Sequence, residues 1–401
     1  MSCRSSWIYL AKLALIFSAG PALAETEGYF GAQLGPTEAD AGVDVVAILP
    51  GSPAAAAGLK VGDNVLSVSG KSPADAKSFA QVIRESGAGS RIDVEFSRGN
   101  QKKRLQIVLG TNPWQNANEP QSGPGLFAVT VHEGVPYVED ESPHEKHYLD
   151  LYVPETRQPS PALLWIHGGG WSFGNRGQDR ALALRLAERG VVVASMSYRL
   201  SSGRWADPDA PEKGFQHPAH VNDVADAFRW LHDKGTDIGL DPEALFVGGH
   251  SAGGHLAALL ATDERYLKAR GLSLGDVAGA VPIGGTYDIP DYHAALTQGE
   301  LEMGQAHIEA VFGETLEEWE DASPTRYLDR STVPILVVVE EQAGFQRYAR
   351  QIVQAARTAK RGNVKRFDAT GRTHGNVILM MSGHHEDEVR AEILKFVKST
   401  G

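Results

Sequence analysis

Residues 249–253, Gly-His-Ser-Ala-Gly, decide how this chain is interpreted. They stand between a strand-like apolar run at 244–248 and a helix-like run at 254–261. In a G-x-S-x-G turn the glycines permit a cramped passage from strand to helix, which exposes the serine hydroxyl at the sheet edge. The helix N-terminus that follows supplies backbone N–H groups and a partial positive charge for a developing oxyanion. The pattern therefore predicts that Ser251 is a nucleophile.

A second motif, His-Gly-Gly-Gly-Trp at 167–171, directly follows another strand-like run. Glycines have no Cβ, so a loop of this kind offers its N–H groups to an oxyanion at close approach. We expect the oxyanion hole to consist of the backbone N–H groups of Gly169, Gly170 and Ala252. Gly168 is the alternative if the loop is shifted by one residue. The two motifs in this order predict a serine hydrolase.

A serine hydroxyl needs a base in contact with it and an acid behind that base. In folds with a G-x-S-x-G turn the order is serine, acid, histidine, and the histidine lies in a loop after the last strand. His374 follows the strand-like run 364–367 and meets both conditions. We therefore predict that His374 is the general base.

With these two motifs the chain resembles an α/β-hydrolase, and the resemblance implies an acid after the strand-like run 334–339, with an aspartate about four residues beyond the strand. Ala343 stands there instead. Glutamate can orient an imidazole equally well, and its extra methylene suits a short loop. Glu341 is the predicted acid, Glu340 is the next choice and Asp288 the third. A weakened or absent acid is the remaining alternative.

The first 24 residues are typical of a secretory signal peptide. Arg4 and Lys12 carry positive charge, 13–17 is an apolar core, and 22–24 is Ala-Leu-Ala. The apolar core is too short and interrupted for a permanent membrane span, so we expect an exported chain, periplasmic or secreted, without a stable span after leader removal.

Composition excludes several classes of partner and site. The chain of 401 residues carries a formal charge of −12, which does not favour binding to nucleic acid or anionic lipid. Cys3 is the single cysteine and would leave with the leader. The mature chain would then have no disulfide, no cysteine nucleophile and no thiolate metal site.

Two modules follow the leader. Between 111 and 126 the chain contains three prolines, two glycines and many amides without apolar periodicity, which predicts a linker. The modules predicted on either side are 25–110 and 127–401.

The front module is expected to be a small α+β domain with strands at 43–49 and 91–97 and a helix at 76–86. Its stretch 50–70, Pro-Gly-Ser-Pro-Ala-Ala-Ala-Ala-Gly-Leu-Lys-Val-Gly-Asp-Asn-Val-Leu-Ser-Val-Ser-Gly, closely resembles a PDZ domain of the bacterial type.

The PDZ resemblance implies binding of an extended peptide C-terminus by strand addition. It places the carboxylate-binding loop at Tyr29, Phe30 and Gly31. Docking of this module on its neighbour, without a peptide ligand, is the alternative.

The back module alternates strand-like runs with amphipathic helices, which predicts an α/β fold with a doubly wound, mostly parallel sheet. The expected strands are 148–153, 162–166, 191–196, 244–248, 277–283, 335–339 and 364–367.

From 127 to 401 the module resembles an α/β-hydrolase, and more closely the HGGGW esterase branch, which includes hormone-sensitive-lipase-like and kynurenine formamidase-like enzymes. The stretches that carry the resemblance are 149–154, 167–171, 239–242, 248–256 and 322–324. It implies hydrolysis of a small-molecule carboxylic ester through an acyl-enzyme, without a metal or organic cofactor. An amide is the alternative substrate.

Two other functions stay open. One is a non-catalytic periplasmic scaffold with a degraded hydrolase domain, and the other is a serine peptidase or amidase guided by the PDZ module.

His217-x-x-His220 has metal-ligand spacing but no H-E-x-x-H context, so a structural pair at a helix N-terminus is expected. Residues 207–213 and 292–320 are the expected lid.

Overall fold

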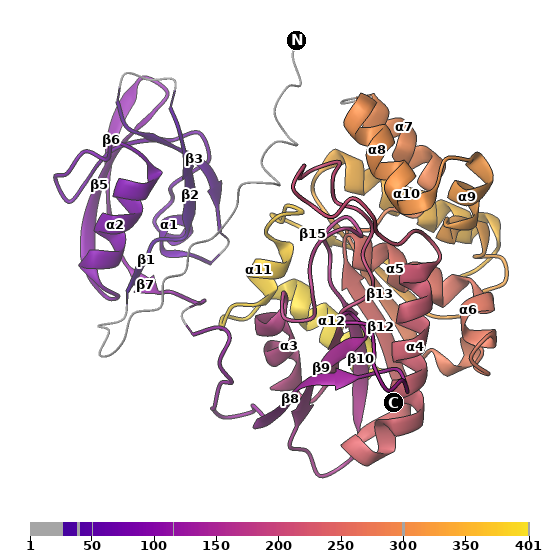
Figure 1. Ribbon diagram of the computed structural model, residues 1–401. Coiled ribbons are helices and arrows are strands. Elements are labelled where there is room, and N and C mark those ends of the chain that lie inside the picture. Colours follow the sequence, from indigo (N-terminus) through magenta and orange to yellow (C-terminus); the bar gives the residue numbers. More distant parts are fainter. Residues whose placement is uncertain (1–26, 38–40, 50, 115, 299–300, 400–401) are drawn as a thin grey trace. The chain divides into compact units, whose positions relative to one another are not determined.

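The computed structural model describes residues 27–399, apart from 38–40, 50, 115 and 299–300. The expected leader lies outside the described residues. The rest forms two compact units, 27–116 and 117–399, which are described separately (Figure 1).

The front unit contains an antiparallel five-stranded sheet in the order β2-β3-β4-β5-β6 and a separate pair, β1 with β7. The strands are β1 (Gly28–Tyr29), β2 (Ala32–Gly35), β3 (Val43–Ile48), β4 (Asn64–Val68), β5 (Arg91–Arg98), β6 (Gln101–Val108) and β7 (Gly110–Thr111), and the helices are α1 (Pro53–Ala56) and α2 (Ala76–Ser86). Helix α2 begins with a capping box at Asp75 and buries Phe79 and Ile83 against the sheet. It spans the residues that its apolar spacing predicts.

The second unit is built on an eight-stranded sheet in the order β15-β14-β13-β12-β10-β11-β9-β8. Its strands are β8 (Val129–Pro136), β9 (Tyr148–Pro154), β10 (Ser160–Ile166), β11 (Val192–Met196), β12 (Leu240–His250), β13 (Gly279–Ile283), β14 (Ile335–Glu340) and β15 (Val364–Ala369). Strands β8 and β9 are antiparallel to their neighbours, and the remaining pairs are parallel. The mostly parallel α/β sheet is therefore confirmed.

Helices cover both faces of this sheet (Figure 1). One apolar core includes side chains of α4 (Ala219–Lys234), α5 (Ala252–Thr262) and α10 (Ala343–Thr358). The other includes side chains of α3 (Arg180–Ala187), α11 (Val377–Met381) and α12 (Glu388–Lys398). Short elements complete the unit: α6 (Glu264–Lys268), η2 (Gly235–Ile238), η3 (Leu274–Asp276) and η4 (Pro324–Arg326).

The expected lid region 292–320 is largely helical. It contains α7 (Ile289–Thr297), α8 (Leu301–Phe312) and α9 (Leu316–Asp321). Residues 207–213 form turns and bends. Within the described part of the chain, no helix is long and apolar enough to cross a membrane.

The segment expected as a linker divides between the two units. Thr111 pairs with Gly28 in the front unit. Farther along, the carbonyl of Glu119 accepts a hydrogen bond from Arg185 Nη2 at 2.9 Å, and the N–H of Gln121 donates to Glu188 Oε1 at 2.5 Å. The second half of the segment is thus held on α3 of the second unit.

Candidate active site

Parallel strands end at the same edge of the sheet, so the loops after them meet there. Residues 167–171 follow β10, Ser251 follows β12, Glu340 ends β14 and His374 lies in the loop after β15. The sheet order places β10 beside β12 and β14 beside β15, with β13 between the two pairs.

Ser251 occupies a strained turn between β12 and α5, with φ 57° and ψ −118°. A positive φ costs a residue with a side chain about 1–3 kcal/mol, and such strain is common at functional sites. The flanking glycines are required by space, because a Cβ at Gly249 would lie 2.4 Å from Ile166 O and one at Gly253 would lie 2.0 Å from it. The structure therefore has the serine turn that the motif predicts.

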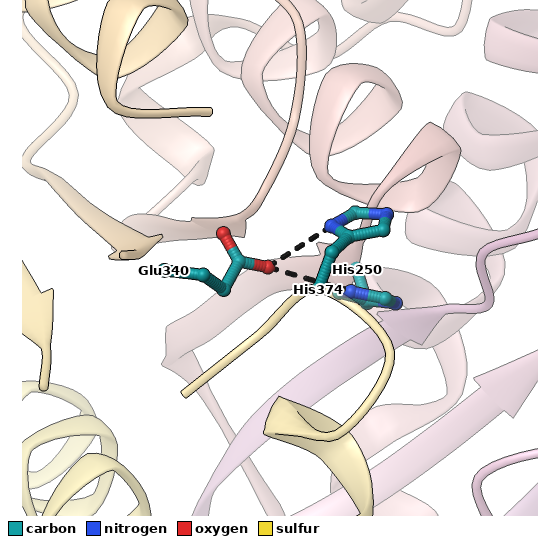
Figure 2. Close-up of side chains that lie close together, drawn as sticks. All are labelled: His250, Glu340 and His374. Carbon is teal, nitrogen blue, oxygen red and sulfur yellow. Dashed lines mark hydrogen bonds and ion pairs between the residues drawn. The ribbon is translucent and has the colours of Figure 1, made fainter. Parts of the chain in front are cut away.

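His374 is held by three contacts. Its Nδ1 lies 3.1 Å from Oε1 of Glu340 (Figure 2). Its ring stacks on Phe345 with a centroid separation of 3.9 Å. Its backbone N–H donates to the side chain of Gln342 at 2.6 Å. These contacts fix the imidazole with one nitrogen on the carboxylate.

The carboxylate that contacts His374 is that of Glu340, the second choice from the sequence, and not that of Glu341, the first choice. Strand β14 extends one residue beyond the predicted end at 339, so Glu340 is still part of the strand and is fully buried. Successive side chains of a strand point to opposite faces, so the next residue cannot share that direction. Glu341 is accordingly exposed to solvent.

The third candidate acid has a structural contact. Asp288 is the N-cap of α7, and its Oδ1 accepts a hydrogen bond from the N–H of Asp291 at 3.0 Å. Such a bond satisfies one of the free N–H groups at a helix start.

Electrostatics at the site favour an ionised Glu340 and a neutral His374. Burial alone raises the pKa of Glu340, but the adjacent imidazoles of His250 and His374 outweigh it and hold that pKa at about 2. Burial lowers the pKa of His374, His250 lowers it further, and Glu340 opposes both. A neutral imidazole is the form that can accept a proton.

Among the described residues, no hydrogen bond links the hydroxyl of Ser251 to His374. Instead, the His374 ring lies against that of His250, the residue before the serine, with centroids 4.4 Å apart and planes at 35°. Contacts between serine and base are often loose without substrate. The two predicted residues therefore reach the same end of the sheet without being bonded.

The expected oxyanion loop has the backbone conformation that only glycine adopts easily. Gly169 has φ 115° and Gly170 has φ 58°. A Cβ on Gly168 would lie 3.3 Å from Cβ of Ser251, so the loop runs directly past that serine. Ala252 is the first residue of α5, where an N–H group has no partner within the helix.

Aromatic side chains line the far side of this loop. Trp205 and His307 stack with centroids 4.0 Å apart, and a Cβ on Gly170 would touch both. Trp171 is buried and donates from Nε1 to His255 Nδ1 at 3.2 Å, so it packs in the core.

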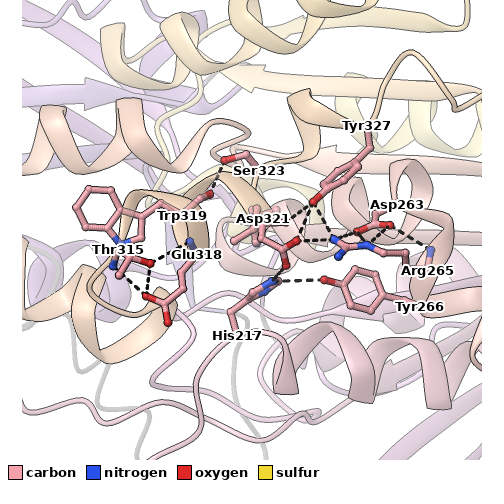
Figure 3. Close-up of polar contacts among 12 residues, drawn as sticks. His217, Asp263, Arg265, Tyr266, Thr315, Glu318, Trp319, Asp321, Ser323 and Tyr327 are labelled. Atoms are coloured by element: carbon pink, nitrogen blue, oxygen red, sulfur yellow. Dashed lines mark hydrogen bonds and ion pairs between the residues drawn. The ribbon is translucent and has the colours of Figure 1, made fainter.

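Both histidines of His217-x-x-His220 have structural partners. His217 Nε2 lies 3.2 Å from Asp321 Oδ2, in a network that includes Arg265 (Figure 3). His220 Nε2 lies 2.9 Å from the hydroxyl of Ser201. The two side chains therefore serve separate contacts.

Three potential metal ligands converge in the described part of the chain. They are His250, Glu340 and His374, whose ligand atoms lie within 4.8 Å of one another. Two imidazoles and a carboxylate suit zinc. Both ring nitrogens lie near the same carboxylate oxygen, Oε1, at 3.6 Å for His250 Nε2 and 3.1 Å for His374 Nδ1. His250 was not among the residues predicted for the site, although its place beside the serine was a signal.

In the front unit, the expected carboxylate loop lies between β1 and the edge strand β2. Gly31 has φ 80°, and a Cβ there would lie 2.1 Å from Cβ of Ser52. Tyr29 pairs with Gly110 in the small sheet, and the Phe30 ring packs on that of Phe79. Among the described residues, no backbone hydrogen bond uses the N–H groups of Phe30 and Gly31.

Comparison with known proteins agrees with this geometry. Residues 149–344 match the family model BD-FAE, and residues 28–109 match the model of the PDZ domain. The chain thus resembles the PDZ domain over its front segment and the BD-FAE family over slightly less than half of its length. Both resemblances drawn from the sequence motifs are thereby confirmed.

Two of the curated relatives are described as ester hydrolases. The probable carboxylic ester hydrolase LipM of Mycobacterium tuberculosis is 30% identical over 48% of this chain and 46% of its own length. Esterase LipC of the same organism is 30% identical over 54% of this chain and 53% of its own. The chain thus spans about half the length of the curated relatives it matches.

Among solved structures, the fold is similar to that of inhibited esterase B from Lactobacillus rhamnosis, with a TM-score of 0.56 and 19% identity over 70% of this chain and 89% of that one. The hyperthermophilic esterase of Pyrobaculum calidifontis has a TM-score of 0.52 and 24% identity over 71% of this chain and 85% of that one. These likenesses establish the α/β-hydrolase fold.

Proposed function

We propose that this protein hydrolyses a carboxylic ester of a small molecule by a serine mechanism, with Ser251 as nucleophile, His374 as base and Glu340 as acid. The observation that carries the proposal is the contact of 3.1 Å between His374 Nδ1 and the buried Glu340 carboxylate, beside a serine turn. Resemblance to an esterase family adds support.

In this mechanism the Ser251 hydroxyl attacks the acyl carbonyl while its proton passes to Nε2 of His374. Glu340 stays ionised and stabilises the imidazolium that forms. The N–H groups of Gly169, Gly170 and Ala252 receive the oxyanion, and His374 returns the proton to the leaving alcohol. Water then attacks the acyl-serine by the same route and releases the carboxylic acid.

The hydroxyl of Ser251 reaches His374 in this proposal when a substrate fills the site. Loss of a single oxyanion donor costs about 3 kcal/mol of transition-state stabilisation in comparable enzymes. No step requires a metal or an organic cofactor.

The test is a pair of measurements on the full chain. Ser251→Ala is expected to abolish turnover of 4-nitrophenyl acetate, and a fluorophosphonate is expected to label wild-type protein on the peptide that contains Ser251. Labelling elsewhere, or wild-type turnover by the alanine variant, contradicts the proposal. Failure of wild-type protein to react with either reagent favours the non-catalytic scaffold.

A peptide C-terminus is the proposed ligand of the front unit. The edge strand β2 and the free N–H groups of Phe30 and Gly31 support strand addition with capture of a terminal carboxylate. Fluorescence polarisation with C-terminal peptides checks this, because amidation of the terminus should remove binding.

Export is the third part of the proposal and depends on the leader-like residues 1–24. Cell fractionation followed by N-terminal sequencing tests it. The expected first residue of the exported protein is Glu25.

A further inference from the structure

Glu340 has two histidine neighbours at one oxygen (Figure 2). Nε2 of His250 lies 3.6 Å from Oε1, the same atom that lies 3.1 Å from Nδ1 of His374. The three side chains come from separate elements, since His250 ends β12, Glu340 ends β14 and His374 lies in the loop after β15. The mechanism above uses only one of these two contacts.

Burial makes the second contact important. The Glu340 side chain is fully buried and that of His250 is 12% exposed. In the described residues, Nε2 of His250 and Oε2 of Glu340 are buried atoms that have no hydrogen-bond partner. A buried carboxylate is destabilising unless hydrogen-bond donors compensate its charge. The Nε2–H group of His250, 3.6 Å from Oε1 of Glu340, can supply such a donor.

We propose that His250 is a positioning residue, which donates to Oε1 of Glu340 and thereby fixes the carboxylate that orients His374. The inference depends on the proposed serine mechanism. A glutamate has one more rotatable bond than the usual aspartate, so a single donor leaves the carboxylate freer to turn. Two donors on different elements, one at the end of β12 and one in the loop after β15, hold Oε1 in one position.

The same arrangement affects the base. An oxygen shared between two imidazoles stabilises the imidazolium of His374 less than an oxygen that serves His374 alone. Loss of the His250 contact should therefore make His374 easier to protonate. Two other ionisable groups lie near this set. Burial raises the pKa of Asp179, although a hydrogen bond from Trp165 and the charge of His250 oppose this, and burial together with Glu340 raises the pKa of Tyr287.

The experiment compares two substitutions of similar shape in the full chain. Met and Gln have nearly the same volume, but only the Gln side chain can donate a hydrogen bond. Active sites are counted with a fluorophosphonate, so that misfolded protein does not enter kcat. The readouts are kcat, KM, the acid limb of kcat/KM against pH, and the low-field ¹H resonance of His374 Nδ1–H.

His250→Met is expected to lower kcat about tenfold, the lower end of what loss of an orienting partner costs. It should leave KM within about twofold, move the acid limb to higher pH and weaken the His374 resonance. His250→Gln is expected to keep kcat, the position of the acid limb and the His374 resonance close to their wild-type values. Equal loss in both variants would show a requirement for shape alone, and wild-type values in His250→Met would show that the contact has no role. Either result overturns the proposal.

A metal is the competing explanation for the three side chains. If wild-type protein treated with EDTA loses activity and ZnCl₂ restores it, the proposal is overturned in favour of a zinc site. Unchanged activity after EDTA supports the two-donor arrangement. The His374 resonance is measured without turnover, so it tests His250 even if wild-type protein fails to hydrolyse esters and the proposed function is wrong.

Discussion

A Cβ on Gly284 would lie 2.2 Å from Oε1 of Glu340 and 2.8 Å from Oε2. Gly284 directly follows β13, the strand beside β14, and has φ 54°. The carboxylate of Glu340 therefore occupies the space that a side chain at position 284 would take. An acid at the end of β14 depends on a glycine at the end of the neighbouring strand.

Gly284→Ala should lower kcat for 4-nitrophenyl acetate by about 10-fold or more, because the methyl group displaces the carboxylate that orients His374. Gly239→Ala is a matched control, since Gly239 also has positive φ (77°) but open space around it. Both variants carry a backbone cost of about 1 kcal/mol. Equal kcat in the two variants would contradict the spatial argument.

Glu340→Gln and Glu341→Gln separate the two candidate acids. Loss of the charge at 340 removes stabilisation of the imidazolium and should reduce kcat by about 10²–10⁴-fold. The exposed side chain at 341 should be replaceable with less than about a twofold change. Steady-state kinetics with counted active sites check both. A larger loss at 341 than at 340 would restore the original choice of acid.

Asp288→Ala tests the helix-cap role of the third candidate. We expect a loss of about 1 kcal/mol in the free energy of unfolding, the usual cost of an N-cap. Values of kcat per active site should stay near wild type, because the carboxylate already binds the backbone of α7. Denaturant unfolding and initial rates measure the two quantities, and a collapse of kcat in a stably folded variant would make Asp288 the acid.

The acid limb of kcat/KM should lie below pH 6.5. Only neutral His374 accepts the serine proton, and burial together with His250 lowers its pKa from that ordinary value. Activity is therefore retained as the pH falls through 6.5 and is lost only as it passes the lowered pKa. A rate profile from pH 4 to 9 with an uncharged ester measures the limb. A limb at or above 6.5 is the contrary result.

Local sequence patterns predicted the elements whose backbone geometry admits few residue types. The turn at Ser251 needs two glycines, and their Cβ atoms would collide with Ile166 O. His374 was predicted from chain order and from its loop after the last strand, and the structure places it in that loop beside Glu340. Helix α2 was placed correctly by its apolar spacing.

The sequence ranked Glu341 above Glu340 because a strand end is defined less sharply by sequence than a turn is. Whether Glu340 or Glu341 faces the base depends on whether β14 ends at 339 or 340, and an error of one residue reverses the direction of a side chain. The contact of His250 with Glu340 joins two strands separated by β13, so no local pattern contains it. Strand β8 was also not predicted, since its residues alternate weakly.

The bonds between residues 118–121 and α3 have a practical consequence for anyone who separates the two domains. Arg185 and Glu188 are fully buried, and the backbone of Glu119 and Gln121 bonds to them. Trimming the chain at residue 127, where the sequence suggests a clean start, would strip these partners and leave a buried charged pair open to water. A hydrolase fragment meant to stay folded should begin at Ala117 or earlier.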